Sequence, residues 1–247
     1  MPMLVFQVCL PERSGAQDRP APPSGFRIVS SDSAPRANTV VISAQSPMRP
    51  HAVAVSIQGK CDYSEDGVTF TNLERGRTLE QGAILRTGNG AKADLFFWRT
   101  GATVRLQGGT ELRFEKMVIN ARAGRPATDI VLDLRAGKIL TVVREVKADS
   151  ILEIRNAAGR SVVESSRAGR YIITAEGTHV SDKDSAAPVT LIGENGTTLI
   201  AAGEQFTKQA GTTHSVPSAS FVQDVSQLDE LQAVAEKPFA MEPSAKP

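Results

Sequence analysis

The sequence predicts an all-β fold: a stacked or solenoid-like β-sandwich of about ten or more short strands, with one short C-terminal helix. Three observations predict it. Short runs of alternating apolar and polar residues recur through the middle of the 247-residue chain, and most are closed by glycine. The 20 Gly, 14 Pro and 5% aromatic residues favour many turns over long helices. Helix signals are scarce before Ser226.

Composition divides the chain into three parts. Residues 1–50 are rich in Pro, Ser, Ala and Arg from Pro11 onward, which predicts a disordered or linker arm. Residues 51–210 contain the alternating runs and predict the folded β domain. Residues 211–247 predict a linker, a short helix and a proline-rich tail.

The pattern of residues 93–98 predicts a central strand of the domain. Leu95 and Phe97 point to one side and Phe96 and Trp98 to the other, so both faces need a cover. A turn at residues 99–101 then predicts a hairpin with the next strand.

That next strand, residues 103–106, predicts one buried and one solvated face. Val104 and Leu106 point one way, and Thr103 and Arg105 the other. The alternation repeats in residues 111–115. We therefore expect one side of these strands to face the core and the other to face water.

Residues 117–128 predict an exposed loop, because Arg122, Gly124, Arg125 and Pro126 break the alternation. A few loop arginines do not make a phosphate site, so we do not interpret them as a functional patch.

A further hairpin is expected from residues 130–135 and 138–143, on either side of Gly137. Strand-like runs then continue to the end of the domain, at residues 151–154, 161–164, 171–175, 189–192 and 198–201.

The expected helix begins near Ser226, which can cap it with Asp229 three positions on. Its apolar stripe consists of Val225, Leu228, Leu231 and Val234.

Charge and targeting signals limit the partners. Lys and Arg number 28 against 27 Asp and Glu, so no strong field attracts nucleic acid, and no apolar run is long enough to span a bilayer.

Residues 3–10 form a short apolar run without preceding basic residues. Two interpretations stay open: the remnant of an export signal that starts upstream, or a tail strand. Lipidation of Cys9 is disfavoured because no small residues precede it.

A longer pattern resembles the FecR domain. It covers roughly residues 53–206, with a glycine turn, an Arg-Thr-Gly step and a strand at residues 79–95. The pattern continues through residues 100–106, 110–112 and 132–139. The opening strands near residues 65–76 and the closing turn at residues 202–206 also fit, with Phe70 where tryptophan is usual.

The resemblance implies an all-β, possibly solenoid-like domain in the periplasm or exported. In the best-known members it implies transmission of an iron-uptake signal from an outer-membrane receptor to a sigma factor. An anti-sigma segment and a membrane-spanning helix are not recognisable in this sequence, and the match is weaker in its second half.

Enzymatic chemistry is not indicated. His51, His179 and His214 have no metal-ligand spacing and are expected to be exposed loop residues. Asp129 and Asp133 share one face of a strand and are interpreted as its solvated side. Neither a nucleophile elbow nor a P-loop occurs, and the sequence implies no cofactor or metal.

The candidate partner-binding residues are Phe96, Trp98 and Arg99, because aromatic residues and arginine at a strand end can anchor a protein. The competing interpretation packs Phe96 and Trp98 under a second layer. We expect a non-catalytic envelope binding or sensory module that engages another envelope protein in signalling. The alternative is a structural or carbohydrate-associated envelope protein.

Overall fold

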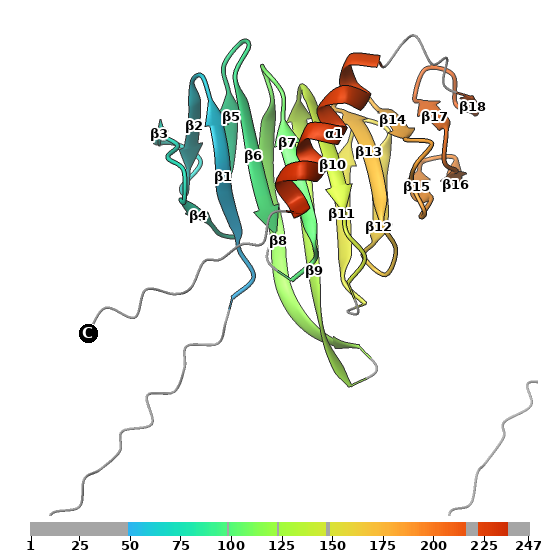
Figure 1. Ribbon diagram of the computed structural model, residues 1–247, viewed down its shortest axis with the longest axis horizontal. Coiled ribbons are helices and arrows are strands. Elements are labelled where there is room, and N and C mark those ends of the chain that lie inside the picture. Colours follow the sequence, from blue (N-terminus) through green and yellow to red (C-terminus); the bar gives the residue numbers. More distant parts are fainter. Residues whose placement is uncertain (1–48, 98, 123, 147–148, 216–221, 237–247) are drawn as a thin grey trace, which may run out of the picture. The chain divides into compact units, whose positions relative to one another are not determined.

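The computed structural model describes residues 49–97, 99–122, 124–146, 149–215 and 222–236. Within these ranges, 18 strands form two nine-stranded sheets, and helix α1 (Val222–Glu236) lies on the outer face of one of them (Figure 1). The expected all-β sandwich with one C-terminal helix is therefore confirmed.

Sheet A contains, in spatial order, β4 (Thr78–Leu79), β1 (Ala52–Gln58), β6 (Lys92–Phe97), β7 (Ala102–Leu106), β10 (Lys138–Val143), β13 (Gly169–Thr174), β14 (Thr178–Ser181), β17 (Glu204–Thr207) and β18 (Thr213–Ser215). Sheet B contains β3 (Thr71–Asn72), β2 (Cys61–Ser64), β5 (Ile84–Thr87), β8 (Glu111–Arg122), β9 (Arg125–Ala136), β11 (Ile151–Asn156), β12 (Gly159–Glu164), β15 (Val189–Gly193) and β16 (Gly196–Ile200). From β5 onward, both orders follow the sequence.

The chain passes repeatedly from one sheet to the other. Neighbouring strands are antiparallel except β9 and β11, which are parallel because β10, between them in sequence, lies in sheet A. The prediction of a hairpin across Gly137 is thus wrong, because β9 and β10 belong to different sheets. Alternation fixes which side chains face the core, but it does not say which sheet supplies them.

The core lies between the sheets. Leu95 and Phe97 of β6 face it, and the Phe97 ring centroid lies 5.9 Å from that of Phe114 on β8. Phe96, on the other side of β6, is 8% exposed, so this strand is covered on both faces as expected.

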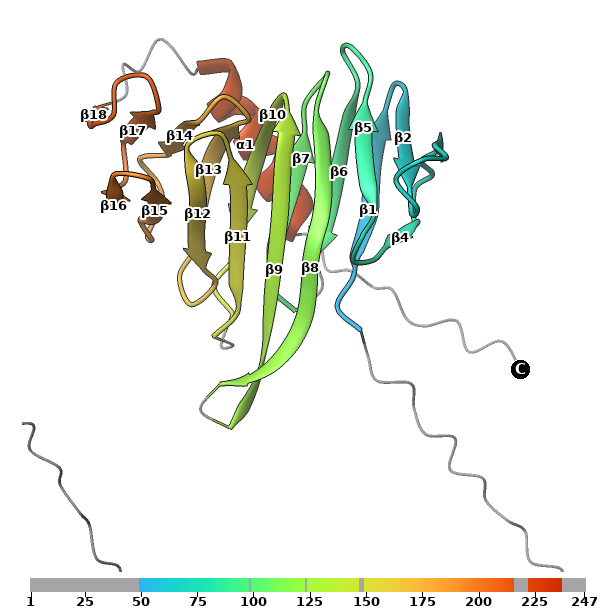
Figure 2. The ribbon, with the colours of Figure 1, turned by 180° about the vertical axis from the view of Figure 1, so that it is seen from behind.

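Residues 117–128 are not a loop. They continue β8 and β9 as a two-stranded arm that extends past the other strands (Figure 2). Pro126 lies opposite Ala121 of β8, but β11 pairs with β9 only from Asp129 onward, so position 126 is on an open edge, where proline is tolerated. We call residues 115–128 the arm.

Helix α1 begins four residues before the expected cap at Ser226. Leu228 and Leu231 are buried as expected, against apolar side chains of sheet A. The expectation that Arg105 faces water is wrong, because α1 covers that side of β7 and the arginine is buried.

Closely packed turns form one end of the sandwich, which we call the upper end. It lies opposite the arm. The Thr87 hydroxyl joins two of these turns: it donates to the carbonyl of Gln107 and accepts from the N–H of Thr110, 2.9 Å away. The Arg-Thr-Gly step of the FecR-like pattern thus has a structural role here.

Replacing Thr87 by valine is expected to lower the free energy of unfolding by about 2 kcal/mol, because the N–H of Thr110 loses its buried acceptor. Urea unfolding measures this change, with Thr71→Val on an exposed strand as the control. Equal effects of the two substitutions would show that the hydroxyl does not tie the turns together.

Candidate functional site

We call the end of the sandwich opposite the close-packed turns the lower end. Three of its segments form the candidate site. They are the β6–β7 turn, the loop that follows β10, and the arm. The N–H of Arg144 in the loop donates to the carbonyl of Gly101 in the turn at 3.1 Å. Farther along the loop, the Asp149 carbonyl accepts from Nη1 of Arg122 at 2.5 Å. The loop therefore connects the turn to the arm.

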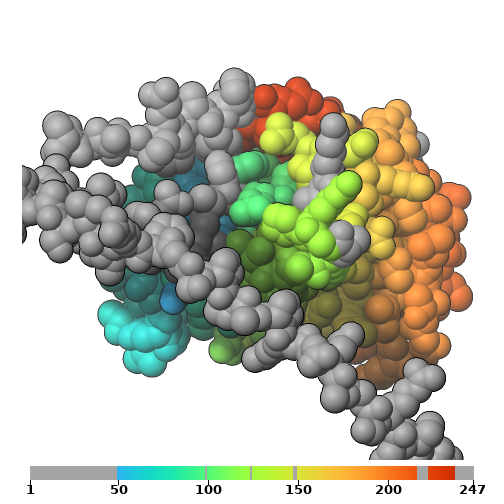
Figure 3. Space-filling view, turned by 90° about the horizontal axis from the view of Figure 1, so that it is seen from below, coloured from blue at the N-terminus to red at the C-terminus, as the bar shows by residue number. Residues whose placement is uncertain are grey.

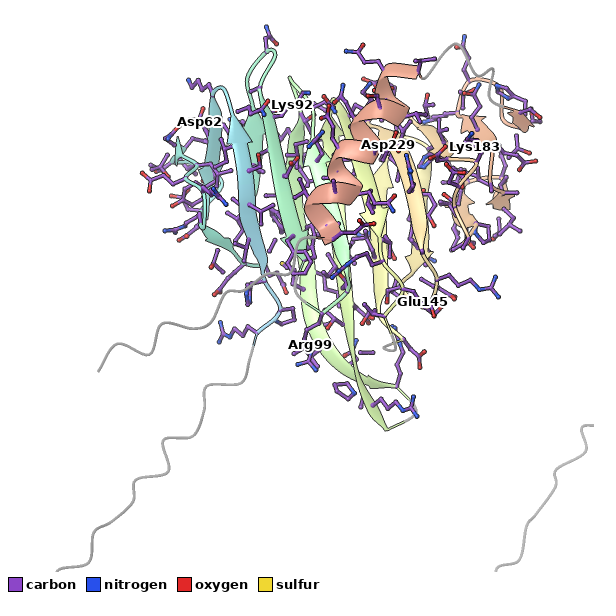
Figure 4. All side chains as sticks on the ribbon, in the orientation of Figure 1. Asp62, Lys92, Arg99, Glu145, Lys183 and Asp229 are labelled. Carbon is purple, nitrogen blue, oxygen red and sulfur yellow. The ribbon has the colours of Figure 1, made fainter. Side chains whose placement is uncertain are left out.

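Arg99 lies in the β6–β7 turn, at this end of the sandwich (Figure 4). Its φ of 75° places it in the left-handed region, and no other non-glycine residue in the described ranges has a positive φ. Such a conformation costs a long side chain about 1 kcal/mol or more. The side chain is exposed and has no ion-pair partner in the described part of the chain. The turn thus presents a cation at the expense of backbone strain.

The arm and the loop after β10 add further basic residues. Arg122 is paired with Asp129, 2.6 Å away, whereas Arg125 and Arg144 are exposed and, within the described ranges, unpaired. In the view from below, the arm stands out between the N-terminal and C-terminal strands (Figure 3). The lower end therefore presents three exposed arginines for which the described residues supply no carboxylate partner.

One edge of the arm is open. β5 pairs with β8 only as far as Arg113, so residues 115–122 have β9 as their sole strand neighbour. Ile119 is 36% exposed on this stretch. The N–H of Met117 on this edge donates to Oε1 of Gln81 at 3.1 Å, so the edge is open beyond Met117. An open strand edge with a partly exposed apolar side chain is a surface on which an extended peptide can pair.

A cavity of about 290 Å³ lies beside the base of the arm. It is lined by Arg122, Asp149, Ser150, Ile151, Glu164 and Ser166. Its volume is at the lower limit for a site that encloses a drug-sized molecule. The lower end thus suits a macromolecular surface better than a small substrate.

The structure describes two of the three predicted binding residues, and they differ in exposure. Phe96 is buried in β6, between Val53 and Thr103 on the adjacent strands, as the competing interpretation expected for it. Trp98 lies outside the described residues. Arg99 is at the surface. From the sequence, Arg125 was interpreted as an ordinary loop residue, and Arg144 was not singled out.

The expectation that His179 is an exposed loop residue is wrong. The side chain lies buried in β14. Asn156 fixes its tautomer. The Asn156 amide donates to the carbonyl of Thr174 at 2.7 Å, and its oxygen accepts from the N–H of Ala158, so the amide must also donate to Nε2 of the histidine, 3.0 Å away.

The proton of His179 is consequently on Nδ1, which donates to the hydroxyl of Ser161 at 2.7 Å. A serine that accepts from histidine is not being activated by it. Burial lowers the pKa of His179 to about 4, which keeps the ring neutral. This cluster is therefore structural.

Other reactive groups are likewise occupied. Asp129 and Asp133 form ion pairs with Arg122 and Arg135, respectively. Burial raises the pKa of the Cys61 thiol, which disfavours the nucleophilic thiolate. Within the described ranges, no group of three or more His, Cys, Asp or Glu residues is placed to hold a metal ion.

No protein-family model matches the chain, and no curated protein matches it. In the part of the chain that the structure describes, no helix has both the length and the apolar character to cross a membrane. The resemblance to the FecR domain stays a prediction.

Proposed function

We propose that the chain is a non-catalytic, FecR-like binding or sensory module of the cell envelope, periplasmic or exported, that engages a protein partner in signalling. The observation that carries the proposal is Arg99: an exposed cation, held in a left-handed turn, to which no described residue supplies an ion-pair partner. Backbone strain concentrates at functional sites, where the surrounding structure maintains it.

The partner surface is expected to be acidic. Arg99, Arg125 and Arg144 offer guanidinium groups that no carboxylate of the described residues neutralises. Arginine suits such a surface because its planar group binds carboxylates in a bidentate manner. The open edge of the arm adds backbone groups for a partner strand.

The carbohydrate-associated alternative has less support. Sugar-binding sites use open aromatic faces, but two aromatic rings of sheet B and its loops are covered by arginine. The Arg77 guanidinium lies 4.7 Å from the Tyr63 ring centroid, and that of Arg86 lies 3.9 Å from the Phe70 centroid.

Substitution of Arg99 tests the proposal. Arg99→Gly is expected to raise the free energy of unfolding by about 1 kcal/mol, because glycine adopts positive φ without strain, and to weaken partner binding at least about tenfold. Arg99→Ala keeps the strained backbone, so it should weaken binding without the gain in stability. Chemical denaturation and binding titrations measure the two effects separately.

The binding experiment uses the tagged full chain as bait for native envelope extract, with bound proteins identified by mass spectrometry. A single saturable protein whose binding weakens with Arg99→Ala, but not with Arg113→Ala on the exposed face of sheet B, supports the proposal. Recovery of peptidoglycan or polysaccharide alone favours the structural alternative, and a partner insensitive to Arg99→Ala contradicts this binding surface.

A further inference from the structure

Helix α1 covers a small surface on the outer face of sheet A. Leu228, Leu231 and Ala235 are its buried apolar residues there. We call the strand side of this contact the α1 groove. Its floor is Leu140, Val142, Ile172 and Val180, and its rim is Arg105, Lys138 and Arg170.

Each rim cation contacts a carboxylate of the helix. The distances are 2.9 Å for Arg105–Glu230, 2.6 Å for Lys138–Asp224 and 2.7 Å for Arg170–Asp229. Figure 4 shows Asp229 on the helix, over the strands of sheet A. The groove therefore combines an apolar floor with a basic rim, and its occupant combines leucines with acidic residues.

The rim arginines also have partners within the sandwich. Arg105 forms a bidentate pair with Asp94 at 2.7 and 2.9 Å, and Nε of Arg170 lies 2.9 Å from a carboxylate oxygen of Asp182. An arginine left without a carboxylate in a buried site is strongly destabilising. Both arginines keep a carboxylate partner, Asp94 or Asp182, when α1 departs. The groove can therefore persist without the helix.

The helix itself is held by modest contacts. The side chains of Asp229 and Glu230 are 65% and 60% exposed, and ion pairs at such positions contribute little. The Lys138–Asp224 pair is better shielded, with the Asp224 side chain 13% exposed, so it is the main ion pair of the helix. The apolar contact consists of two leucines and one alanine. Elements with few buried apolar contacts open locally before the whole domain unfolds.

From these contacts we propose that the α1 groove binds an acidic amphipathic helix of a partner protein, and that α1 is the internal competitor which this helix displaces. Charge complementarity defines the class of occupant. The occupant needs leucine-sized side chains three residues apart and a small residue four positions later. It also needs carboxylates where α1 has Asp224, Asp229 and Glu230. This inference goes beyond the proposed function, because the surface around Arg99 is not involved.

The test uses three fluorescent peptides and the full chain. The first peptide spans residues 220–237. The second keeps only the six recognition positions, with every other residue replaced. The third is the first peptide with Asp224→Asn, Asp229→Asn and Glu230→Gln. Anisotropy titrations are made with the unchanged chain and with a Leu228→Gln/Leu231→Gln variant, in which the internal helix is weakened.

The first two peptides are expected to bind the variant at least about tenfold more tightly than the unchanged chain, because tethering gives α1 an effective concentration of about 1 mM. The amide peptide is expected to bind the variant at least about tenfold more weakly than the first. The milder Asp229→Asn/Glu230→Gln variant should give an intermediate gain. Circular dichroism confirms that each variant is folded, and Arg160→Gln on sheet B should leave all affinities unchanged.

Three results would overturn the proposal: no binding of the first two peptides to folded variants, equal binding of the amide peptide, or a dimer of the unchanged chain that the double-glutamine variant loses. The last result would make a second copy the occupant. Because the Arg99 substitutions test the lower end, failure of either proposal is recognised independently of the other.

Discussion

Replacing Gly137 by alanine is expected to lower the free energy of unfolding by about 4 kcal/mol. Gly137 has a φ of 77°, and a Cβ built there lies 2.6 Å from the hydroxyl oxygen of Thr110 and 2.7 Å from the carbonyl oxygen of Gly109. The Thr110 hydroxyl cannot move away freely, because it donates to the carbonyl of Lys138 and accepts from its N–H. Denaturant unfolding of the purified variant measures the loss.

Gly90→Ala is the matched control. Gly90 has a φ of 71°, but a Cβ built there has no neighbour within 4 Å. Its substitution therefore adds left-handed strain alone, at about 1 kcal/mol. If the two variants lost equal stability, close packing of the turns would not be the reason for glycine at position 137.

Acidification from pH 7 to pH 4 is expected to remove about 3 kcal/mol of stability through His179. Its folded-state pKa of about 4 lies below the ordinary histidine value of 6.5, so the unfolded chain binds the proton first as the pH falls. The contribution is complete above pH 6.5 and is lost progressively between pH 6.5 and 4. Urea unfolding at half-unit pH intervals measures this slope.

A His179→Gln variant separates this histidine from other groups. It is expected to be less stable at pH 7, because the hydrogen bonds to Asn156 and Ser161 are disturbed, and to show a much flatter pH dependence between 6.5 and 4. Asp66, whose pKa is lowered by hydrogen bonds from the N–H groups of Thr69 and Val68, contributes at more acidic pH. An unchanged slope in the variant would assign the effect to another group.

The sequence predicted the class of fold because alternation records which side chains face the core. For the same reason it predicted residues 93–97 of the strand expected at 93–98, residue 98 lying outside the described residues, and Leu228 and Leu231 on the helix. It failed for the arm because Gly124 and Pro126 are turn signals, and here glycine forms the tip while proline occupies an open edge.

Burial of charged and polar side chains was not predictable in the same way. Arg105 has the pattern of a solvated residue, and only the position of α1 shows that it is covered. One signal was available: in the expected hairpin, Asp94 lies directly opposite Arg105, and opposite charges in such a register indicate a cross-strand pair. His179 gave no comparable signal, because its partners Asn156 and Ser161 come from strands of the other sheet.

Arg99 was identified from the sequence by its residue type and its place at a strand end. Its positive φ was not, because the neighbouring Gly101 is the residue that normally indicates such a turn. Arg144 comes next to the turn through the hydrogen bond that its N–H donates to the carbonyl of Gly101, a contact between segments far apart in the sequence.

The passage of the chain between the two sheets also determines how the domain can grow. From β5 onward, each new strand is added beside those that precede it in the sequence, in one sheet or the other. A hairpin pair inserted near β15 and β16 or near β17 and β18 would lengthen the stack without rethreading any earlier strand, as in repeat proteins whose units contact only their neighbours. Such an architecture permits duplication or loss of terminal units during evolution, while the central strands that hold the Gly137 turn remain in place.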